Sequence, residues 1–445
     1  MLDARRTGQA GLACAIADSP AGSVGATVAS DGAGQALALR RRRDGSLRVV
    51  SRAELAHCRR WSSAFAGHRK HHGYYELVED TIRQGFDYRY FVIADAAGEV
   101  GAVQPFFLLD QDLLAGVGPG VAAVAKLARR VWPRLLKVRT LMVGCAAGEG
   151  HLDGDESAHA VNAARLAAGI VAQARRLRAR LIVLKEFPAQ YREPLECFRR
   201  SGFARVPSMP MTRLNIDYSS FDDYMNQALN SATRRKLRRK FRIAAESPPI
   251  EMSVVDDIAP LIDAVYPLYI QVYERSKLRF EKLTKEFFCG LAEMGPERVR
   301  FFVWRQEAKI IAFSFCMLEG DDFYPEYVGF DYSVALQLHL YHYIVRDMIA
   351  WAIAHGCKWL RSSPLNYDPK LHLRHRLDPT DLYVRHTSPL ANVVLKRILP
   401  LIEPTRYDRT LRKFANYSEL WGELNPRGAR PGLIRSWYAG CRRSA

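Results

Sequence analysis

The chain has 445 residues, of which 48% are hydrophobic and 25% are charged. This composition is typical of a globular protein, and it excludes a wholly disordered chain, a collagen and a coiled-coil rod. Lys and Arg number 65 against 47 Asp and Glu, which gives a formal net charge of +18. A surplus of this size favours anionic partners, such as the phosphates of a nucleotide cofactor, nucleic acid or an acidic membrane surface.

The eight cysteines are widely spaced and form no Cys-x-x-Cys pair. This spacing argues against a knuckle-type zinc site and a thioredoxin-like pair, and it indicates a reducing compartment. The first residues lack the order of a signal peptide, and the chain has no apolar stretch of about 18 residues that could span a bilayer. We therefore expect a cytoplasmic protein, and we predict no metal site.

The predicted elements fall into two series of the same order between two tails. Residues 1–36 are rich in Gly, Ala and Ser and predict a disordered tail, and residues 425–445 predict a basic tail. In each series a hairpin precedes a long helix and a further strand. The ranges of the first series are a helix over 53–65, a hairpin over 88–107, a helix over 157–178 and a strand over 180–186.

The second series contains a hairpin over 299–318, a strand over 323–330, a helix over 338–355 and a strand over 358–363. Gly356 is typical of the residue that ends a helix in a left-handed conformation. Strands that alternate with helices predict an α/β architecture. We expect two related domains, 37–218 and 219–424, with an additional segment in the first before its last strands.

A basic helix is predicted where the second half begins, over residues 231–242. Seven of the nine residues from 234 to 242 are basic, while Leu229, Leu237 and Phe241 share one helical face. So many like charges oppose helix formation unless anions or acidic groups lie nearby. We weigh a solvated linker helix equally against a helix that binds cofactor phosphates, RNA or lipid headgroups.

The residues from 299 to 386 carry a resemblance to a known family. The local matches are Tyr327–Phe330, Ile349–Gly356, Lys370 nine residues before Pro379, and Tyr383–His386. On these, the chain resembles the GNAT superfamily of N-acyltransferases. Its duplication, with a basic helix opening the second half, resembles the Fem-type peptidyltransferases and their acetyltransferase relatives around peptidoglycan biosynthesis. The resemblance covers about 47–420 and implies two tandem GNAT-like domains with mixed α/β sheets.

The chain departs from the acetyl-CoA enzymes of that superfamily in the loop that precedes the second-half helix. Their Gln/Arg-x-x-Gly-x-Gly/Ala pattern is absent, and the segment Ser333–His339 contains no glycine. Backbone amides at a helix start can still bind phosphate. We therefore expect an acyl donor in the second half, with acyl-CoA as a co-substrate and no permanently bound cofactor.

An N-acyltransferase must deprotonate an amine, hold it against a carbonyl carbon and stabilise an oxyanion. By the resemblance, the strand ending at Phe330 lines the acyl site. Our candidates for the base are Glu326, His342 and His339, while Tyr341 or Tyr367 would protonate the leaving group. We expect the donor to contact Val328, Gly329, Phe330, Lys370, Arg374 and Arg376. Each side chain could instead be structural or solvent-facing.

Two segments have the pattern of interfacial helices, in which an apolar face accompanies basic residues. These are residues 113–137, which include Trp132, and residues 390–413. For each segment alone, an ordinary amphipathic helix packed on its domain is the favoured interpretation. Together with the net charge, they favour peripheral contact with the inner face of an anionic membrane.

Three functions compete on this evidence. We favour an N-acyltransferase that moves an acyl group from an acyl-CoA or acyl-carrier thioester to an amine by direct attack. Its acceptor would be hydrophobic or lipid-linked, such as a sphingoid-type long-chain base in bacterial ceramide synthesis. The alternative is an aminoacyl-tRNA-dependent Fem-like peptidyltransferase, although no helical arm is predicted between the halves. A non-catalytic nucleic-acid-binding protein is least favoured, because no known module is present.

Overall fold

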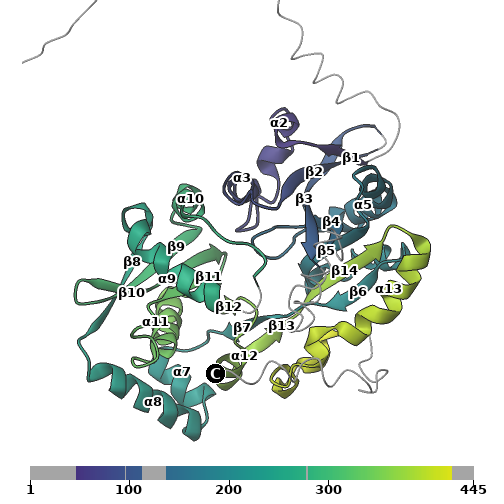
Figure 1. Cartoon of the computed structure of the whole chain (residues 1–445). Helices are drawn as coiled ribbons and strands as arrows, with labels where there is room; N and C mark the ends of the chain where they lie inside the picture. The colour runs from purple at the N-terminus through teal and green to yellow at the C-terminus, as the bar shows by residue number, and fades with distance from the viewer. Residues whose placement is uncertain (1–46, 96, 113–136, 277–278, 423–445) are drawn as a thin grey trace, which may run out of the picture. The chain divides into compact units, whose positions relative to one another are not determined.

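The computed structural model describes residues 47–95, 97–112, 137–276 and 279–422. All of them belong to one compact unit, Arg43–Ala445. Two seven-stranded mixed sheets form this unit (Figure 1). The mixed α/β class predicted from the sequence is confirmed.

The first sheet has the strand order β1-β2-β3-β4-β5-β14-β6. Only its β4–β5 pair is parallel. Its strands from the first half are β1 Leu47–Val50, β2 Asp87–Ala94, β3 Val100–Asp112, β4 Lys137–Val143, β5 Leu181–Pro188 and β6 Ala204–Pro207. The helices of this half are α2 Arg52–Leu55, α3 His72–Thr81, α5 Glu156–Arg176 and α6 Glu196–Arg200.

The second sheet has the order β13-β7-β12-β11-β10-β9-β8. Its strands from the second half are β8 Ile250–Val255, β9 Val299–Gln306, β10 Lys309–Glu319, β11 Asp322–Phe330, β12 Trp359–Ser362 and β13 Arg376–Asp378. The helices of the second half of the chain are α7 Phe221–Ala228, α8 Ser231–Ala245, α9 Ile262–Arg275, α10 Lys285–Gly290, α11 Leu340–Ala354, α12 Tyr367–His372 and α13 Pro389–Ile402.

The two halves exchange one strand each. Strand β7, Met211–Asn215, follows β6 in the chain but lies between β12 and β13 of the second sheet. Strand β14, Thr380–His386, follows β13 but lies between β5 and β6 of the first sheet. Each sheet therefore has the same order, with its sixth strand donated by the other half. This symmetry confirms the predicted duplication and ties the halves together.

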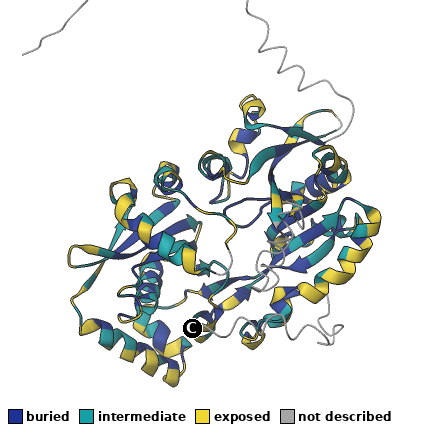
Figure 2. Cartoon of the chain, viewed as in Figure 1, coloured by how far each residue is buried: buried dark blue, intermediate teal, exposed yellow. Residues whose placement is uncertain are grey.

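Helix α9 packs directly on β11 because glycine occupies position 329. A Cβ atom there would lie 2.6 Å from the backbone nitrogen of Tyr269 and would also collide with the Phe313 ring. The glycine therefore permits a close helix–strand approach that a side chain would prevent. Most strand residues are buried, whereas the outer faces of α8 and α13 are exposed (Figure 2).

Most predicted elements are confirmed, including the long helices α5 and α11 and the basic helix α8. The left-handed Gly356 has a φ of 69°. The helix predicted over 53–65 is wrong: α2 ends at Leu55 and a short 3₁₀ turn covers Trp61–Ser63. Here tertiary contacts override helical periodicity, because Arg60 binds Asp153 and the Gly101 carbonyl.

Some predictions lie outside the described residues. These are the tails 1–36 and 425–445 and nearly all of the segment 113–137. Among the described residues, no helix combines the length and apolar character that a bilayer crossing requires.

Candidate functional site

The second sheet opens between its two parallel central strands. Strand β11 pairs with β12 only at Asp322 with Trp359 and Phe323 with Leu360. Since β11 continues to Phe330, most of its length has no partner on that side. In the first sheet, the equivalent strand β4 keeps its pairing with β5 through Val143, its last residue.

Strand β11 also contains a β-bulge at Glu326. On the neighbouring strand β10, Phe315 faces Tyr327 while Cys316 faces Pro325, so that Glu326 is an extra residue. A bulge of this kind redirects side chains and is common beside functional sites. Glu326 is directed to Arg69 and Lys70 of the first half, whereas the neighbouring Tyr327 binds Glu281 of the second half.

The Glu326 carboxylate is buried against two cations from the first half. Arg69 donates from Nε at 3.0 Å and from Nη2 at 2.9 Å, and Lys70 Nζ lies at 3.3 Å. The side-chain exposures of Glu326, Arg69 and Lys70 are 8%, 2% and 0%. The Arg69 guanidinium also stacks 3.6 Å above the Tyr324 ring. A carboxylate so placed balances buried charge.

A second carboxylate, Glu149, completes this charge cluster from the loop after β4. It accepts from Arg69, from Lys70 Nζ at 2.7 Å and lies 3.1 Å from His151 Nε2. The other nitrogen of His151 lies 3.2 Å from the Tyr191 hydroxyl. Burial lowers the pKa of His151 although Glu149 opposes the shift, which favours the neutral imidazole.

Glu319, at the end of β10, extends the cluster within the second half. It accepts from the Arg69 backbone nitrogen at 2.9 Å, and His68 Nδ1 lies 3.5 Å away. Although burial alone would raise it, the His68 hydrogen bond and the Arg69 charge lower the pKa of Glu319 to about 2. The segment His68–Lys70 therefore connects the first half to two strands of the second.

A separate polar group surrounds Tyr327. Its hydroxyl donates to Glu281 Oε1 at 2.5 Å, from the connection between α9 and α10. Burial raises the pKa of Glu281, while the nearby Lys185 charge opposes that shift. Lys185, on β5, donates to Glu186 Oε2 at 2.7 Å and to the Gly148 carbonyl at 2.8 Å. Glu281, like Glu326, is half-buried as a whole residue.

The backbone at Glu186 has a φ of 56°, which is uncommon for a residue with a Cβ. It coincides with a bulge where β5 pairs with the exchanged strand β14, between Asp381 and Tyr383. Such strained positions are concentrated at functional sites. The strained residue and its neighbour Lys185 thus belong to the polar group of Glu281.

The first turn of α11 lies beside the basic helix α8. His342 Nε2 lies 2.9 Å from Lys240 Nζ. Burial and the Lys240 charge lower the pKa of His342 to about 4, so its imidazole is neutral at pH 7. His339 precedes the helix with a φ of 50°, and burial together with Lys240 and Arg239 lowers its pKa. Both predicted histidines therefore face cations.

Tyr341 and Lys370 lie at the carboxyl end of β12. Tyr341 hydrogen-bonds with the Asn366 side chain, and burial raises its pKa to about 12. Lys370 Nζ donates to the Ser363 carbonyl at 2.5 Å. Burial lowers the pKa of Lys370 to about 7, and burial with the Lys370 charge lowers that of His375 to about 3. Lys370 is therefore a buried amine near its titration point at neutral pH.

The remaining predicted site residues have other partners. The Tyr367 hydroxyl donates to the Pro210 carbonyl at 2.8 Å and is buried. Arg374 binds the Ala228 carbonyl and Arg376 binds Glu419, and both are exposed. Val328, Gly329 and Phe330 lie on the unpaired part of β11. Their predicted roles stay predictions.

Helix α8 presents a strongly basic outer face. Its exposed cations are Arg235, Lys236, Arg238, Arg239 and Arg242, and none of them forms an ion pair within the described part of the chain. An open groove of about 440 Å³ lies between α7, α8 and α11, where Arg238 and Arg346 face Asp222 and Phe241. Its volume is in the range of small-molecule sites.

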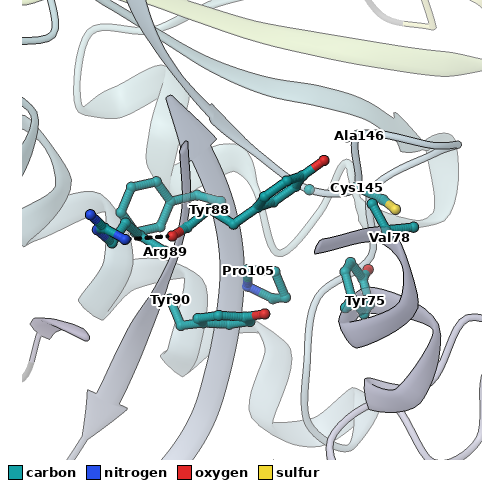
Figure 3. A pocket seen from close by; sticks show the side chains of 10 residues that line it. Tyr75, Val78, Tyr88, Arg89, Tyr90, Pro105, Cys145 and Ala146 are labelled. Atoms are coloured by element: carbon teal, nitrogen blue, oxygen red, sulfur yellow. Dashed lines mark hydrogen bonds between the residues drawn. The ribbon is translucent and has the colours of Figure 1, made fainter. Parts of the chain in front are cut away.

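The first half contains a much smaller cavity, which Figure 3 shows from close by. Tyr75, Tyr88 and Tyr90 line it together with Cys145. Its volume is about 10 Å³, which is room for roughly one water molecule. This cavity is therefore too small for a substrate. No group of three metal-ligating side chains occurs among the residues that the structure describes.

Sequence reasoning missed the charged residues that the first half contributes, above all Arg69, Lys70 and Glu149. Two local patterns could have indicated them. The run Gly67–His72 is dense in basic and imidazole side chains, and the loop after β4 contains four glycines, three with positive φ. At Gly148 a Cβ would collide with Lys70 Nζ, so this glycine makes room for the buried lysine.

Comparison with protein families gives one match. Residues 130–363, more than half of the chain, match the FemAB-like family model, which is described as peptidoglycan biosynthesis/recognition. No curated protein sequence matches the chain.

Several solved structures are similar to the model. FemX has 11% identity and a TM-score of 0.44, over 72% of this chain and 93% of that chain. L-PGS from Bacillus licheniformis has 10% identity and a TM-score of 0.44, over 73% and 94%. A tandem GNAT protein from the clavulanic acid biosynthesis pathway has 10% identity and a TM-score of 0.39, over 72% and 88%. At such identities the similarities say nothing of substrate.

Proposed function

This chain belongs to the FemAB-like family, and we propose that it is an acyltransferase that moves an acyl or aminoacyl group from a phosphate-bearing donor to an amine. The observation that carries the proposal is the opening between β11 and β12, beyond the pair of Phe323 with Leu360. Backbone amides on the open edge of β11 are free to bind the acyl oxygen and to stabilise the oxyanion that forms on it.

The donor's phosphates would bind where α8 meets the start of α11. Arg239 and Lys240 bring positive charge to His339 and His342 at that start, while the amides of Leu340, His342 and Tyr343 already donate to backbone carbonyls. These cations stand in for the glycine-rich loop that the sequence lacks. In this arrangement the phosphates remain on the α8 side while the acyl carbonyl reaches β11.

The amine would attack the carbonyl carbon directly, without an acyl-enzyme. Glu281 is the best-placed base, because its pKa is raised by burial and it remains half-buried above β11. The amine proton passes to the Glu281 carboxylate as the new C–N bond forms. The bond between the acyl carbon and the leaving group breaks, and its electron pair departs with the leaving group. Glu326, our sequence-based choice, is held by Arg69 and Lys70 and suits charge balance better.

For the donor and acceptor we propose a long-chain acyl-CoA and a hydrophobic or lipid-linked amine at the inner face of the cytoplasmic membrane. The side chains packed around β11, such as Phe313, Phe315 and Tyr269, are apolar and buried, so an acyl chain that entered there would meet apolar surroundings. A sphingoid-type base is one such acceptor.

The second candidate is an aminoacyl-tRNA donor. Helix α8 has 15 residues and is about 22 Å long, so its exposed cations extend further than one pyrophosphate needs. Cations spread along a surface in this way are typical of contacts with a nucleic-acid backbone. The family's description favours this candidate as much as the first.

The test combines purified protein with palmitoyl-CoA and sphinganine, and in a parallel reaction with mixed aminoacyl-tRNAs and the same amine. Mass spectrometry detects the amide, and a thiol reagent detects released CoA. We expect amide formation with one donor class. No amide with either donor, across long-chain and lipid-linked amines, would contradict the proposed acyl transfer.

The donor site is tested separately with Arg239→Gln/Lys240→Gln. We expect the donor KM to rise by at least about tenfold, because each lost cation removes a charge-assisted phosphate contact. The matched control is Arg59→Gln/Arg83→Gln, which removes two exposed cations of the first half. Equal KM values in both variants would exclude α8 from donor binding.

A further inference from the structure

Helix α13 carries an unusual concentration of exposed apolar side chains. Nine large apolar side chains are exposed among the described residues, and six of them belong to this helix: Leu390, Val393, Val394, Ile398, Leu401 and Ile402. Leu390 is the most exposed, at 83%. Figure 2 shows the outer surface of α13 mainly in the colour of exposed residues. A contiguous apolar face of this kind marks an interaction surface.

The orientation of α13 is fixed by its inner face. Asn392 is buried, accepts from the His386 backbone nitrogen at 3.0 Å and donates to the Gly202 carbonyl at 2.9 Å. Leu395 and Leu399 pack on the apolar core between the halves. The apolar residues of the outer face are thus held away from the protein, since the helix cannot rotate without breaking these contacts.

The surroundings of the α13 start are strongly basic. Thr387 donates its backbone N–H to the Arg180 carbonyl, and Arg180 donates to the Arg139 carbonyl, so the ends of β14, β5 and β4 lie side by side. This edge bears six exposed cations: Lys137, Arg139, Arg175, Arg176, Arg178 and Arg180. Within the described residues, their single ion pair joins Arg139 to Asp87 at 3.6 Å.

Helix α13 adds to this charge. It contains no acidic residue, and its Lys396 and Arg397 are exposed beside the apolar residues. An apolar helix face accompanied by cations is the pattern of a segment that lies in the boundary of an anionic bilayer. We propose that α13 and the neighbouring arginine edge dock this protein on an anionic membrane surface.

The charge distinguishes this occupant from two others. A symmetric dimer through α13 would bring the same basic surface of each copy together, and like charges would face one another. The segment 113–136 joins β3 to β4 at the same edge, where the strand register places Asp112 opposite Lys137. It contains Lys126, Arg129, Arg130 and Arg134 and no acid, so it does not neutralise the arginines either. Anionic lipid headgroups would neutralise the arginines.

The proposal deepens the proposed function, because it rests on a membrane-bound acceptor for its purpose. Its test needs no donor and no turnover, so its failure is distinguishable from a failure of acyl transfer. The full chain is mixed with sucrose-loaded vesicles of phosphatidylcholine, with or without 30% phosphatidylglycerol, and the bound fraction is measured after sedimentation. We expect binding to the anionic vesicles that weakens at 0.5 M salt.

Two variants separate the apolar and the charged contributions. Leu390→Gln/Val394→Gln/Ile398→Gln should reduce the vesicle partition coefficient by at least about tenfold, and Arg178→Glu/Arg180→Glu should abolish the preference for anionic lipid. The control is Val161→Gln, which changes an exposed apolar side chain on α5 and should bind as the original protein does. Circular dichroism and thermal unfolding verify that each variant is folded.

Three results would overturn the proposal. The first is a folded full-length protein that does not bind anionic vesicles. The second is unchanged binding by the triple α13 variant. The third is a dimer in analytical ultracentrifugation that the triple variant converts to a monomer, because a second copy would then cover α13.

Discussion

The two halves of the chain form sheets with the same strand order but differ at one parallel pair. Strand β4 remains paired with β5 to its last residue, Val143, whereas β11 leaves β12 after Phe323. In the first half, the equivalent pair is closed, and the small cavity of about 10 Å³ lies elsewhere, where α3, β2, β3 and the loop after β4 line it. Duplication has therefore produced one closed copy and one open copy.

The closed copy stabilises the open copy through buried contacts. Its segment His68–Lys70 and its loop residue Glu149 form buried ion pairs that reach Glu319 and Glu326 of the second half. The exchanged strands β7 and β14 connect the same two halves through backbone pairing. The comparison teaches that a duplicated fold can keep both copies while the sheet of only one opens between its parallel strands.

The largest expected effect follows from removing Arg69. Arg69→Met leaves Glu149 and Glu326 with Lys70 and leaves Glu319 with His68, and an uncompensated buried charge costs about 3–5 kcal/mol of unfolding free energy. Urea denaturation measures the loss. The control, Arg52→Met, removes the half-exposed pairs with Glu76 and Asp80 and should cost about 1 kcal/mol or less. If Arg69→Met and Arg52→Met lower the free energy of unfolding by similar amounts, the buried charge cluster does not stabilise the contact between the halves.

The second prediction separates the two carboxylates that the open copy presents at β11. Glu281→Gln should lower kcat by about 10²–10⁴-fold at pH 7, the usual cost of losing a general base, with a smaller loss at high pH where the amine is already neutral. Glu326→Gln should act chiefly on stability, because it removes one partner of Arg69 and Lys70. The opposite pattern would make Glu326 the base and restore our sequence-based choice.

The amino-acid sequence predicts the repeat because its signals are local. The long helices α5 and α11, the basic helix α8 and the hairpins all appear as hydrophobic periodicity. The strand exchange cannot be predicted in this way. Strand β7 pairs with β12 at Arg213 and Arg361, which are far apart in the chain. The sequences of β7 and β12 would show the same pattern if each sheet contained only strands of its own half.

The site is predicted only in its second-half part, for a similar reason. Tyr341 and Lys370 are brought to the end of β12, and their roles remain predictions. We make no prediction for Arg69 and Lys70 from the sequence. Their burial depends on Glu149, 79 residues from Lys70, and on the second half, so the basic run and the glycine-rich loop could indicate these residues but not their burial.

A smaller effect is expected at the glycine that admits Lys70. In Gly148→Ala, the new Cβ would collide with Lys70 Nζ, and the φ of 115° is unfavourable for alanine. Overpacking of this kind typically costs about 1–3 kcal/mol. Gly320→Ala is the matched control, since its φ is also positive, at 56°, but nothing lies within 4 Å of its Cβ. If Gly148→Ala lowers the free energy of unfolding no more than Gly320→Ala does, Lys70 moves to accommodate the new Cβ atom.

The smallest effect concerns the acid limb of stability, and Glu319 of the open copy determines it through His68 and Arg69 of the closed copy. The pKa of Glu319 is about 2 in the folded protein and about 4.3 in an unfolded chain. A depressed carboxyl pKa stabilises the fold above the unfolded value, and this stabilisation is lost as pH falls from about 4.3 through 2. In Glu319→Gln, the urea concentration at the unfolding midpoint should therefore fall less steeply between pH 5 and 3, and it should be lower at pH 7 than in the original protein.

The control is Glu54→Gln on the exposed side of α2, which caps that helix with Ser51 and does not contact the second half. If Glu319→Gln leaves the acid limb unchanged, the salt link between the closed and open copies does not depend on this carboxylate.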